Sequence, residues 1–320
     1  TVSDSSFSTT RDKGVGEDEL SGLELPWSQI PGGTPTARAD ALMCGKRGLM
    51  LFWHSPLDDA DSLGTPVLGG VFGVRSSTAQ DVSVSLDSIL SVLGDRLLVH
   101  EDGFGTNASH TAPGKFEWSG LSLRAIACEV IRQCTEAKPA GTLPIDLPWL
   151  GEQGQHQRMD YQDWDVQNQS CQQILTKLAN VVGGPDMQFR PYLSDSQHVR
   201  YRFEAGSDGD VYLGQKTVHS LDWHPYGGTL EDLKVDRMAP TMRVYATGAG
   251  SDKATMCCLA EDLTLCRTSD PWPLREGAYS DSDTKTYGVL ESHAKARLAA
   301  GSKPLMQLSG TVSAEDVDAS

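Results

Sequence analysis

The stretch Ile174–Leu193, ILTKLANVVGGPDMQFRPYL, joins two kinds of periodicity. Its first half repeats apolar residues at helical spacing, and its second half, MQFRPYL, is typical of a strand. Between them lie Gly183, Gly184 and Pro185. A phosphate-binding loop has its glycines between a strand and the start of a helix, where backbone N–H groups face the anion. Here the glycines follow a helix, whose C-terminal end repels anions, so the motif predicts a helix that ends at Gly183 and a chain reversal.

Three helices are predicted. In the first, LSLRAIACEVIRQCTEA at 121–137, apolar residues repeat on one face, and Ser119 or Ser122 is expected to cap it. The second leads into the glycine corner and is expected to begin at Asn168 or Ser170. A segment rich in Pro and Gly, 138–154, crosses between them as an irregular loop. The third is GVLESHAKARLAAG at 288–301.

Strand patterns dominate the rest of the chain. Val82, Val84 and Leu86 alternate with polar residues, which predicts a half-buried strand. The glycines of PVLGGVFGVRSS suit a bent strand, as in a small barrel. Together the patterns predict a β-rich α+β fold, with further strands at RGLMLFWH (47–54), MQFRPYL (187–193), HVRYRFEAG (198–206), VYLGQ (211–215) and MRVYATGAG (242–250).

The charge balance limits the kinds of partner that the chain is expected to bind. The 320 residues include 27 Lys and Arg against 43 Asp and Glu, a formal net charge of −16. Tight binding to a phosphate backbone needs clustered basic residues, so a nucleic-acid-binding role is disfavoured. No apolar run approaches the roughly 20 residues that span a bilayer. The first 20 residues are polar and acidic, which predicts a flexible arm and no secretory signal.

No metal or cofactor site is predicted from the cysteines and histidines. Cys257, Cys258 and Cys266 lack the paired spacing of zinc ligands, and adjacent strand residues point to opposite faces. His219 and His224 are five apart, which matches no metal-hydrolase motif. Three other cysteines fall on apolar helical positions and are expected to be buried: Cys128, Cys134 and Cys171.

No catalytic residue is predicted either. Asp160, Asp163 and Asp165 lie around Tyr161 and Trp164, and acids flanked by aromatic residues occur in glycoside hydrolases. The simpler interpretation is that these acids complement the positive end of the following helix while the aromatic rings pack on the core. No serine-nucleophile motif is present in the sequence. The chain is therefore predicted not to be an enzyme.

Several stretches, taken together, resemble the minor tail proteins of siphophages that infect actinobacteria, the family that forms the baseplate or tail-tip hub. The most specific match is a helix followed by Gly-Gly-Pro-Asp and an apolar strand, here Gly183–Asp186 and Phe189. A second is the strand into ATGAG (246–250), which Asp236-Arg237 precede. Asp95-Arg96 matches the end of a short helix in the family. The full set of stretches is 24–42, 67–75, 82–98, 161–191 and 230–262.

The resemblance implies a hub-type fold with two small, tail-tube-like β-barrel units and helical insertions, assembled as a homotrimer. Three copies of two barrels would mimic the six-fold ring of a tail tube, cap or continue it, and let phage DNA pass. The implied partners are the distal tail protein, the tape-measure protein and other tail-tip proteins. The implied location is the tail tip of the virion, after synthesis in the host cytoplasm. No catalytic motif accompanies the resemblance.

Four segments are expected: an acidic arm (1–20), an N-terminal β-barrel-like domain (21–118), a helical insertion with the Pro-rich crossover (119–185) and a second β-rich domain (186–320). The family continues past the late helix, so the last domain is expected to be incomplete or completed by another chain. Two alternatives stay open. One is a tail-associated peptidoglycan hydrolase, and the other is a carbohydrate-binding tail module that uses Trp118, Trp149 or Trp164.

Overall fold

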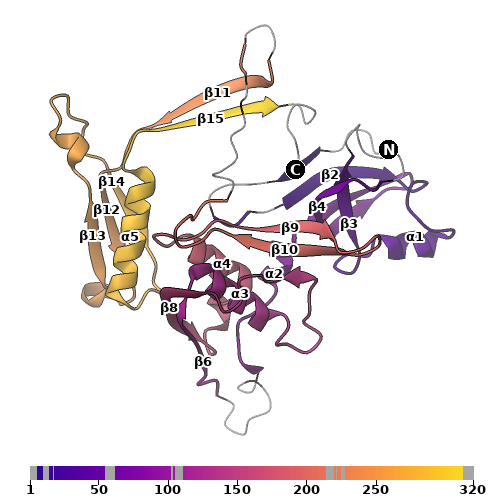
Figure 1. Ribbon diagram of the computed structural model, residues 1–320, viewed down its shortest axis with the longest axis horizontal. Coiled ribbons are helices and arrows are strands. Elements are labelled where there is room, and N and C mark those ends of the chain that lie inside the picture. Colours follow the sequence, from indigo (N-terminus) through magenta and orange to yellow (C-terminus); the bar gives the residue numbers. More distant parts are fainter. Residues whose placement is uncertain are drawn as a thin grey trace. The chain divides into compact units, whose positions relative to one another are not determined.

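The computed structural model describes residues 6–9, 14–16, 18–54, 62–101, 104, 111–213, 220, 222–224 and 228–312 (Figure 1). They form two compact units, unit 1 from within Thr1–Ala179 and Gly183–Gln215, and unit 2 from within Asn180–Val182 and Lys216–Ala319. Both units combine strands with helices, so the fold is α+β and rich in strands. In the part of the chain that is described, no helix is long and apolar enough to cross a membrane.

Unit 1 contains a five-stranded antiparallel sheet in the order β1-β2-β5-β4-β3. Val82, Val84 and Leu86 are buried while their neighbours are not, which confirms the predicted half-buried strand. The core of this sheet also takes in Leu42, directly after the short helix α1 (Pro35–Ala41). The strands are β1 (Ser6–Thr9), β2 (Asp18–Pro26), β3 (Gly48–Trp53), β4 (Thr65–Ser77) and β5 (Asp81–Asp87).

Strand β4 is bent, as its glycines predicted. Its pairing with β5 shifts register between Phe72 and Arg75, which marks a bulge. A side chain at Gly70 would come within 2.4 Å of the Asp87 carbonyl oxygen, so the two strands approach more closely than a Cβ allows. The sheet ends in β1 and β3, which are not paired with each other among the described residues. The two predicted barrel units therefore stay a prediction.

Three helices of unit 1 begin at serine caps, whereas Thr34 caps α1. The backbone N–H of Ala125 donates to Ser122 Oγ at 3.1 Å, so Ser122 caps α3 (Leu123–Cys134). Ser170 and Gln173 bond each other's backbone N–H at the start of α4 (Cys171–Ala179), a reciprocal capping box. Helix α3 packs against α4, and α4 packs against a third helix. That helix is α2 (Ile89–Gly94), and a 3₁₀ turn (Val166–Asn168) precedes α4.

Two smaller sheets complete unit 1. A three-stranded sheet has the order β7-β10-β9, with Tyr201 and Phe203 buried on one face as predicted. The predicted strand at 211–215 is wrong for Val211–Leu213, because these residues follow the 207–210 turn as irregular backbone. The remaining pair, β6 with β8, was not predicted. The strands are β6 (Lys115–Leu121), β7 (Ile145–Asp146), β8 (Gln153–Gln162), β9 (Met187–Leu193) and β10 (Val199–Ala205).

The glycine corner lies between α4 and β9. Gly183 has φ +72°, a left-handed conformation that favours glycine. The predicted helix end is wrong, because α4 ends at Ala179, four residues before Gly183. A side chain at Gly184 would lie 2.2 Å from the Ala179 carbonyl oxygen, so the chain folds back directly against the helix end.

Asp186 connects this corner to distant parts of unit 1. Its N–H donates to the Val211 carbonyl at 2.7 Å, and its own carbonyl accepts from Gly206 at 3.0 Å. Its carboxylate accepts from the backbone N–H of Gly14 at 2.9 Å, and Met187 donates to the carbonyl of the same glycine at 2.7 Å. Part of the segment predicted to be an acidic arm is thus bonded to the start of β9.

In unit 2 a helix covers one face of a three-stranded sheet, ordered β13-β12-β14 (Figure 1). The helix, α5 (Tyr287–Gly301), confirms the predicted late helix, and Glu291 and Lys295 pair along it at 2.8 Å. Separately, β11 and β15 pair as an antiparallel two-stranded ribbon. The strands are β11 (Leu230–Met238), β12 (Arg243–Thr247), β13 (Cys257–Glu261), β14 (Glu276–Ser280) and β15 (Leu305–Val312), and short 3₁₀ turns lie at Asp252–Ala254 and Thr264–Arg267.

Because Gly184 lies close to the Ala179 carbonyl, a methyl group added at this glycine is predicted to destabilise the fold. We expect Gly184→Ala to lower the free energy of unfolding by about 1–3 kcal/mol, because the new Cβ would overlap the Ala179 carbonyl. Gly209→Ala is the matched control, since a Cβ there meets nothing within 4 Å, and its effect should stay within about 0.5 kcal/mol. Chemical denaturation of both variants measures the difference, and equal effects would contradict the steric account of the corner.

Candidate functional site

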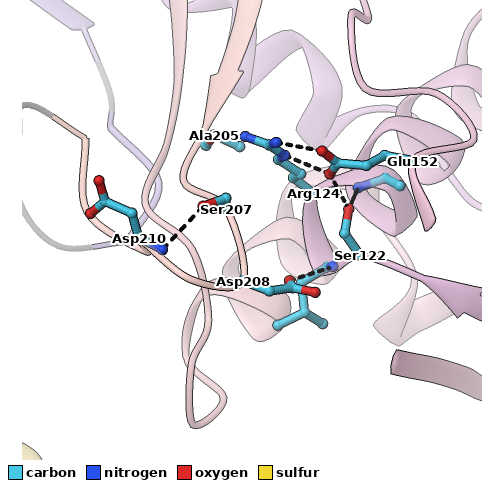
Figure 2. A network of polar contacts seen from close by, with 9 residues as sticks. Ser122, Arg124, Glu152, Ala205, Ser207, Asp208 and Asp210 are labelled. Carbon is cyan, nitrogen blue, oxygen red and sulfur yellow. Dashed lines mark hydrogen bonds and ion pairs between the residues drawn. The ribbon is translucent and has the colours of Figure 1, made fainter. Parts of the chain in front are cut away.

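A polar cluster lies at the start of α3 and joins segments far apart in the sequence (Figure 2). One carboxylate oxygen of Glu152 accepts from Ser122 Oγ at 2.5 Å and from Arg124 Nε at 2.6 Å. The other oxygen accepts from Arg124 Nη2, which makes the pair bidentate. The guanidinium also lies over the Trp149 ring, 4.8 Å from its centroid. The Ser122 hydroxyl therefore takes part in both the helix cap and the contact with Glu152.

The turn after β10 closes on the same helix end. One oxygen of the Asp208 carboxylate accepts from the backbone N–H of Leu123 at 3.2 Å, where a negative charge complements the helix dipole. The other lies 3.3 Å from His156 Nε2. The turn itself is held by the Asp210 N–H, which donates to Ser207 Oγ at 3.0 Å. The cluster therefore fixes α3, β8 and the turn after β10 to one another.

The ion pair between Arg124 and Glu152 shifts the pKa of both residues. The hydrogen bond from Arg124 lowers the pKa of Glu152; burial opposes this shift, and the Ser122 hydroxyl adds to it. The hydrogen bond from Glu152 in turn raises the pKa of Arg124, against the effect of burial. Both groups are charged at neutral pH, as a positioning ion pair requires. A general acid would instead need a raised carboxyl pKa.

The aspartates considered for hydrolysis have separate surroundings. Asp163 is 1% exposed, and its carboxylate accepts from the backbone N–H of His100 at 3.0 Å and contacts the Nδ1 of the same residue at 2.9 Å. A Cβ at Gly114 would come within 2.2 Å of Asp163 Oδ2, so backbone fills the space beside that oxygen. Asp165 is half-buried, and the side chain of Asp160 lies outside the described residues. Asp163 therefore joins its loop to the distant segments at His100 and Gly114.

The three tryptophans considered for carbohydrate binding also differ. Trp118 lies in an aromatic row, 5.7 Å from Phe116 and 5.9 Å from Tyr161 by ring centroids. Trp149 is half-buried beneath Arg124. Trp164 is 56% exposed, so the expectation that it packs on the core is wrong, whereas that expectation is confirmed for the buried Tyr161.

The cysteines and histidines form no metal cluster in the described ranges. On β13, Cys257 is exposed and Cys258 is buried, which confirms that the two side chains point to opposite faces. Cys266 is half-buried in a separate 3₁₀ turn. His224 is described, whereas His219 lies outside the described residues.

Three thiols lie in the helical core as predicted. Cys128, Cys134 and Cys171 are all buried on α3 and α4. Burial raises the pKa of Cys128 to about 12. Burial also raises the pKa of Cys171, and a hydrogen bond with Cys134 adds to the effect. These thiols are small apolar packing groups, because a reactive cysteine needs access and a lowered pKa.

Two end strands carry apolar side chains that their units do not fully bury, although Leu49 and Leu51 of β3 pack in part against the core of the five-stranded sheet. Strand β3 carries Leu49, Met50, Leu51, Phe52 and Trp53 in succession, and all five are only half-buried. On β15 every residue before Val312 is exposed, with Met306 at 59% and Leu308 at 58%. Contiguous exposed apolar surface of this kind marks interaction sites. No single residue in these strands predicted the surfaces from the sequence.

Comparisons with known proteins give structural likenesses only. No family model and no curated protein matches the sequence. One similar structure is the 43 kDa tail protein of prophage MuSo2 from Shewanella oneidensis, with 10% identity over 90% of this chain and 71% of that one, at a TM-score of 0.39. Another is the prophage tail protein gp18 from Listeria monocytogenes EGD-e, with 9% identity over 89% and 69%, at a TM-score of 0.34. Both are prophage tail proteins.

The Glu152 ion pair predicts a pH-dependent effect on stability. Because the folded pKa of Glu152 is lowered, its stabilising contribution is complete above the unfolded pKa, about 4.5, and is lost as the pH falls through the lower folded value. We expect the destabilisation by Glu152→Gln to be largest near pH 7 and to shrink below about pH 4.5. Urea denaturation across this range measures it, with the exposed Glu117→Gln as control. A loss that is independent of pH would contradict the ion-pair role.

The burial of the thiols predicts their order of reaction. In the native protein Cys44 and Cys257, both exposed, should react rapidly with a thiol reagent such as dithionitrobenzoate. Cys128, Cys134 and Cys171 should react only after denaturant is added, because their side chains are buried and the reagent cannot reach them. Mass spectrometry of labelled peptides identifies the sites. Rapid native labelling of the α3 or α4 thiols would contradict their placement.

Proposed function

We propose that the chain is a structural protein of a phage tail. The observation that carries the proposal is the Gly-Gly-Pro-Asp corner, which the resemblance to tail-tip proteins singled out. In the fold it is a packing junction: Gly184 touches the end of α4, and Asp186 bonds three backbone positions. A motif with this role belongs to a scaffold, because it positions elements and presents no group to a substrate.

The more specific proposal is a tail-tip or baseplate hub that assembles as a homotrimer and caps or continues the tail tube. Its neighbours would be the distal tail protein, the tape-measure protein and other tail-tip proteins, and it would reside at the tail tip of the virion. The net charge of −16 supports a lumen that DNA passes without binding, since like charges repel. The uncovered apolar strands β3 and β15 support association with further chains.

A non-enzymatic role also fits the polar groups. Ser122, Glu152 and Asp163, which in other surroundings would suggest catalysis, are each bonded to a backbone or ionic partner that uses the functional atom. Their contacts join segments of unit 1. We infer that these side chains serve the stability of the scaffold.

The oligomeric state tests the hub proposal. We expect purified protein to give the mass of three chains by light scattering and three-fold rings in negatively stained images. It should also co-purify with the distal tail protein when both are expressed together. A single chain at every concentration, without a complex with the distal tail protein, would contradict the proposal.

Two assays test the alternative functions. Clearing of a peptidoglycan suspension, lost in Asp165→Asn, would favour the hydrolase. Binding to intact host cells, lost in Trp164→Ala, would favour the carbohydrate-binding module, and the exposure of Trp164 makes it the residue to change. The proposed function expects neither activity from the purified protein.

A further inference from the structure

Strands β3 and β15 share features that the end strands β9, β11, β13 and β14 lack. Strand β3, GLMLFW, and strand β15, LMQLSGTV, each contain no charged residue and no proline. Each lies at the end of its sheet, β3 beyond β4 and β15 beside β11. Among the described residues β3 pairs only with β4, and β15 only with β11. Both therefore present an unpaired row of backbone N–H and C=O groups.

The end strands β9, β11, β13 and β14 carry features that oppose pairing with another chain. Strand β9 carries Pro191 and the exposed Arg190, and β13 and β14 carry Glu261 and Glu276. Strand β11, LEDLKVDRM, has five charged residues and a bulge, with Asp232 at φ +50°. Charges, proline and bulges are the usual means by which edge strands avoid association. Strands β3 and β15 contain neither a charge nor a proline, which indicates edges that another chain covers.

The low stability expected of an isolated β11–β15 ribbon also indicates that another strand covers the edge of β15. A two-stranded ribbon is marginally stable in water unless a third strand or a packed layer supports it. The side chains of β15 alternate, with Met306, Leu308 and Val312 on one face and polar residues on much of the other. A third strand beside β15 would extend that apolar face and satisfy the open backbone groups.

We propose that β15 of one copy of the chain adds to the free edge of β3 in a second copy. This inference rests on the proposed function, because it supplies the contact through which the copies would assemble. The contact joins two different surfaces of the chain, so it is heterologous, the kind of contact that forms a ring when its rotation closes. Pairing β15 with its own counterpart would form a two-fold dimer and leave the apolar β3 uncovered.

Charge favours a second copy at these two edges. Each chain carries −16, so two copies repel each other wherever their acidic surfaces meet. Strands β3 and β15 together contain 14 residues, and none of them is charged. Pairing these two strands therefore places no acidic side chain of one copy opposite an acidic side chain of the other within the strands. Apolar side chains half-buried on β3 would become buried against Met306 and Leu308 of the next copy.

A charge placed in either strand tests the pairing. We expect Leu308→Lys and Met50→Lys each to weaken self-association at least about tenfold, because a lysine in an edge strand opposes strand addition. Leu259→Lys is the matched control, since Leu259 is also an exposed strand leucine of unit 2 but lies on the charged strand β13. Sedimentation measures association, and circular dichroism checks that each variant folds. Leu308 is exposed, so its variant should fold even if Met50→Lys does not.

Cross-linking tests the pairing directly. In a background with Cys44→Ser and Cys257→Ser, a Met50→Cys chain is mixed with a Leu308→Cys chain and treated with a short bismaleimide. A cross-linked pair of chains should form in this mixture and not when Leu259→Cys replaces Leu308→Cys. If the wild type associates but the lysine variants associate equally and no cross-link forms, the strand pairing is wrong and the hub proposal stands. If the wild type does not associate at all, both fail.

Discussion

The contacts of Asp186 are the constraint on which unit 1 depends. One residue bonds the backbone at Gly14, Gly206 and Val211, while Gly184, two positions earlier, lies directly against the end of α4. A buried backbone group that loses its partner costs about 1–3 kcal/mol, so the arrangement allows little variation in where β9 starts. That starting point sets the register of β9 with β10, and with it the placement of Phe189 against Phe203 in the core.

Much of the fold could be predicted because its signals are local. The alternation in β5, the apolar face of α3, the cap at Ser122 and the left-handed Gly183 each depend on residues within one turn or one strand. The elements that were missed depend on distant partners. Strand β8 is largely polar and exists because it pairs with β6, and β15 pairs with a strand some seventy residues earlier in the chain. Strand formation of this kind follows tertiary context more than propensity.

The polar clusters could be predicted only in part for the same reason. Ser122 was recognisable as a cap, but its partner Glu152 lies 30 residues away, and Asp208 lies 85 residues from the backbone N–H that it accepts from. Asp163 is of a residue type that can serve as a catalytic acid. Only the structure shows that His100 bonds its carboxylate and that the backbone of Gly114 lies beside it. A sequence specifies which chemical groups are present, whereas solvent access and pairing arise from long-range folding.

The bond between Gly14 and Asp186 has a consequence for biosynthesis. It spans 172 positions, so the beginning of the chain cannot reach its place until residue 186 has left the ribosome. At translation rates of about 5–20 residues per second, that delay is on the order of ten to thirty seconds. During this interval β9 has not yet emerged, so the segment around Gly14 lacks the partner that it later meets. Chaperones or other emerging chains would encounter unit 1 in this unfinished form.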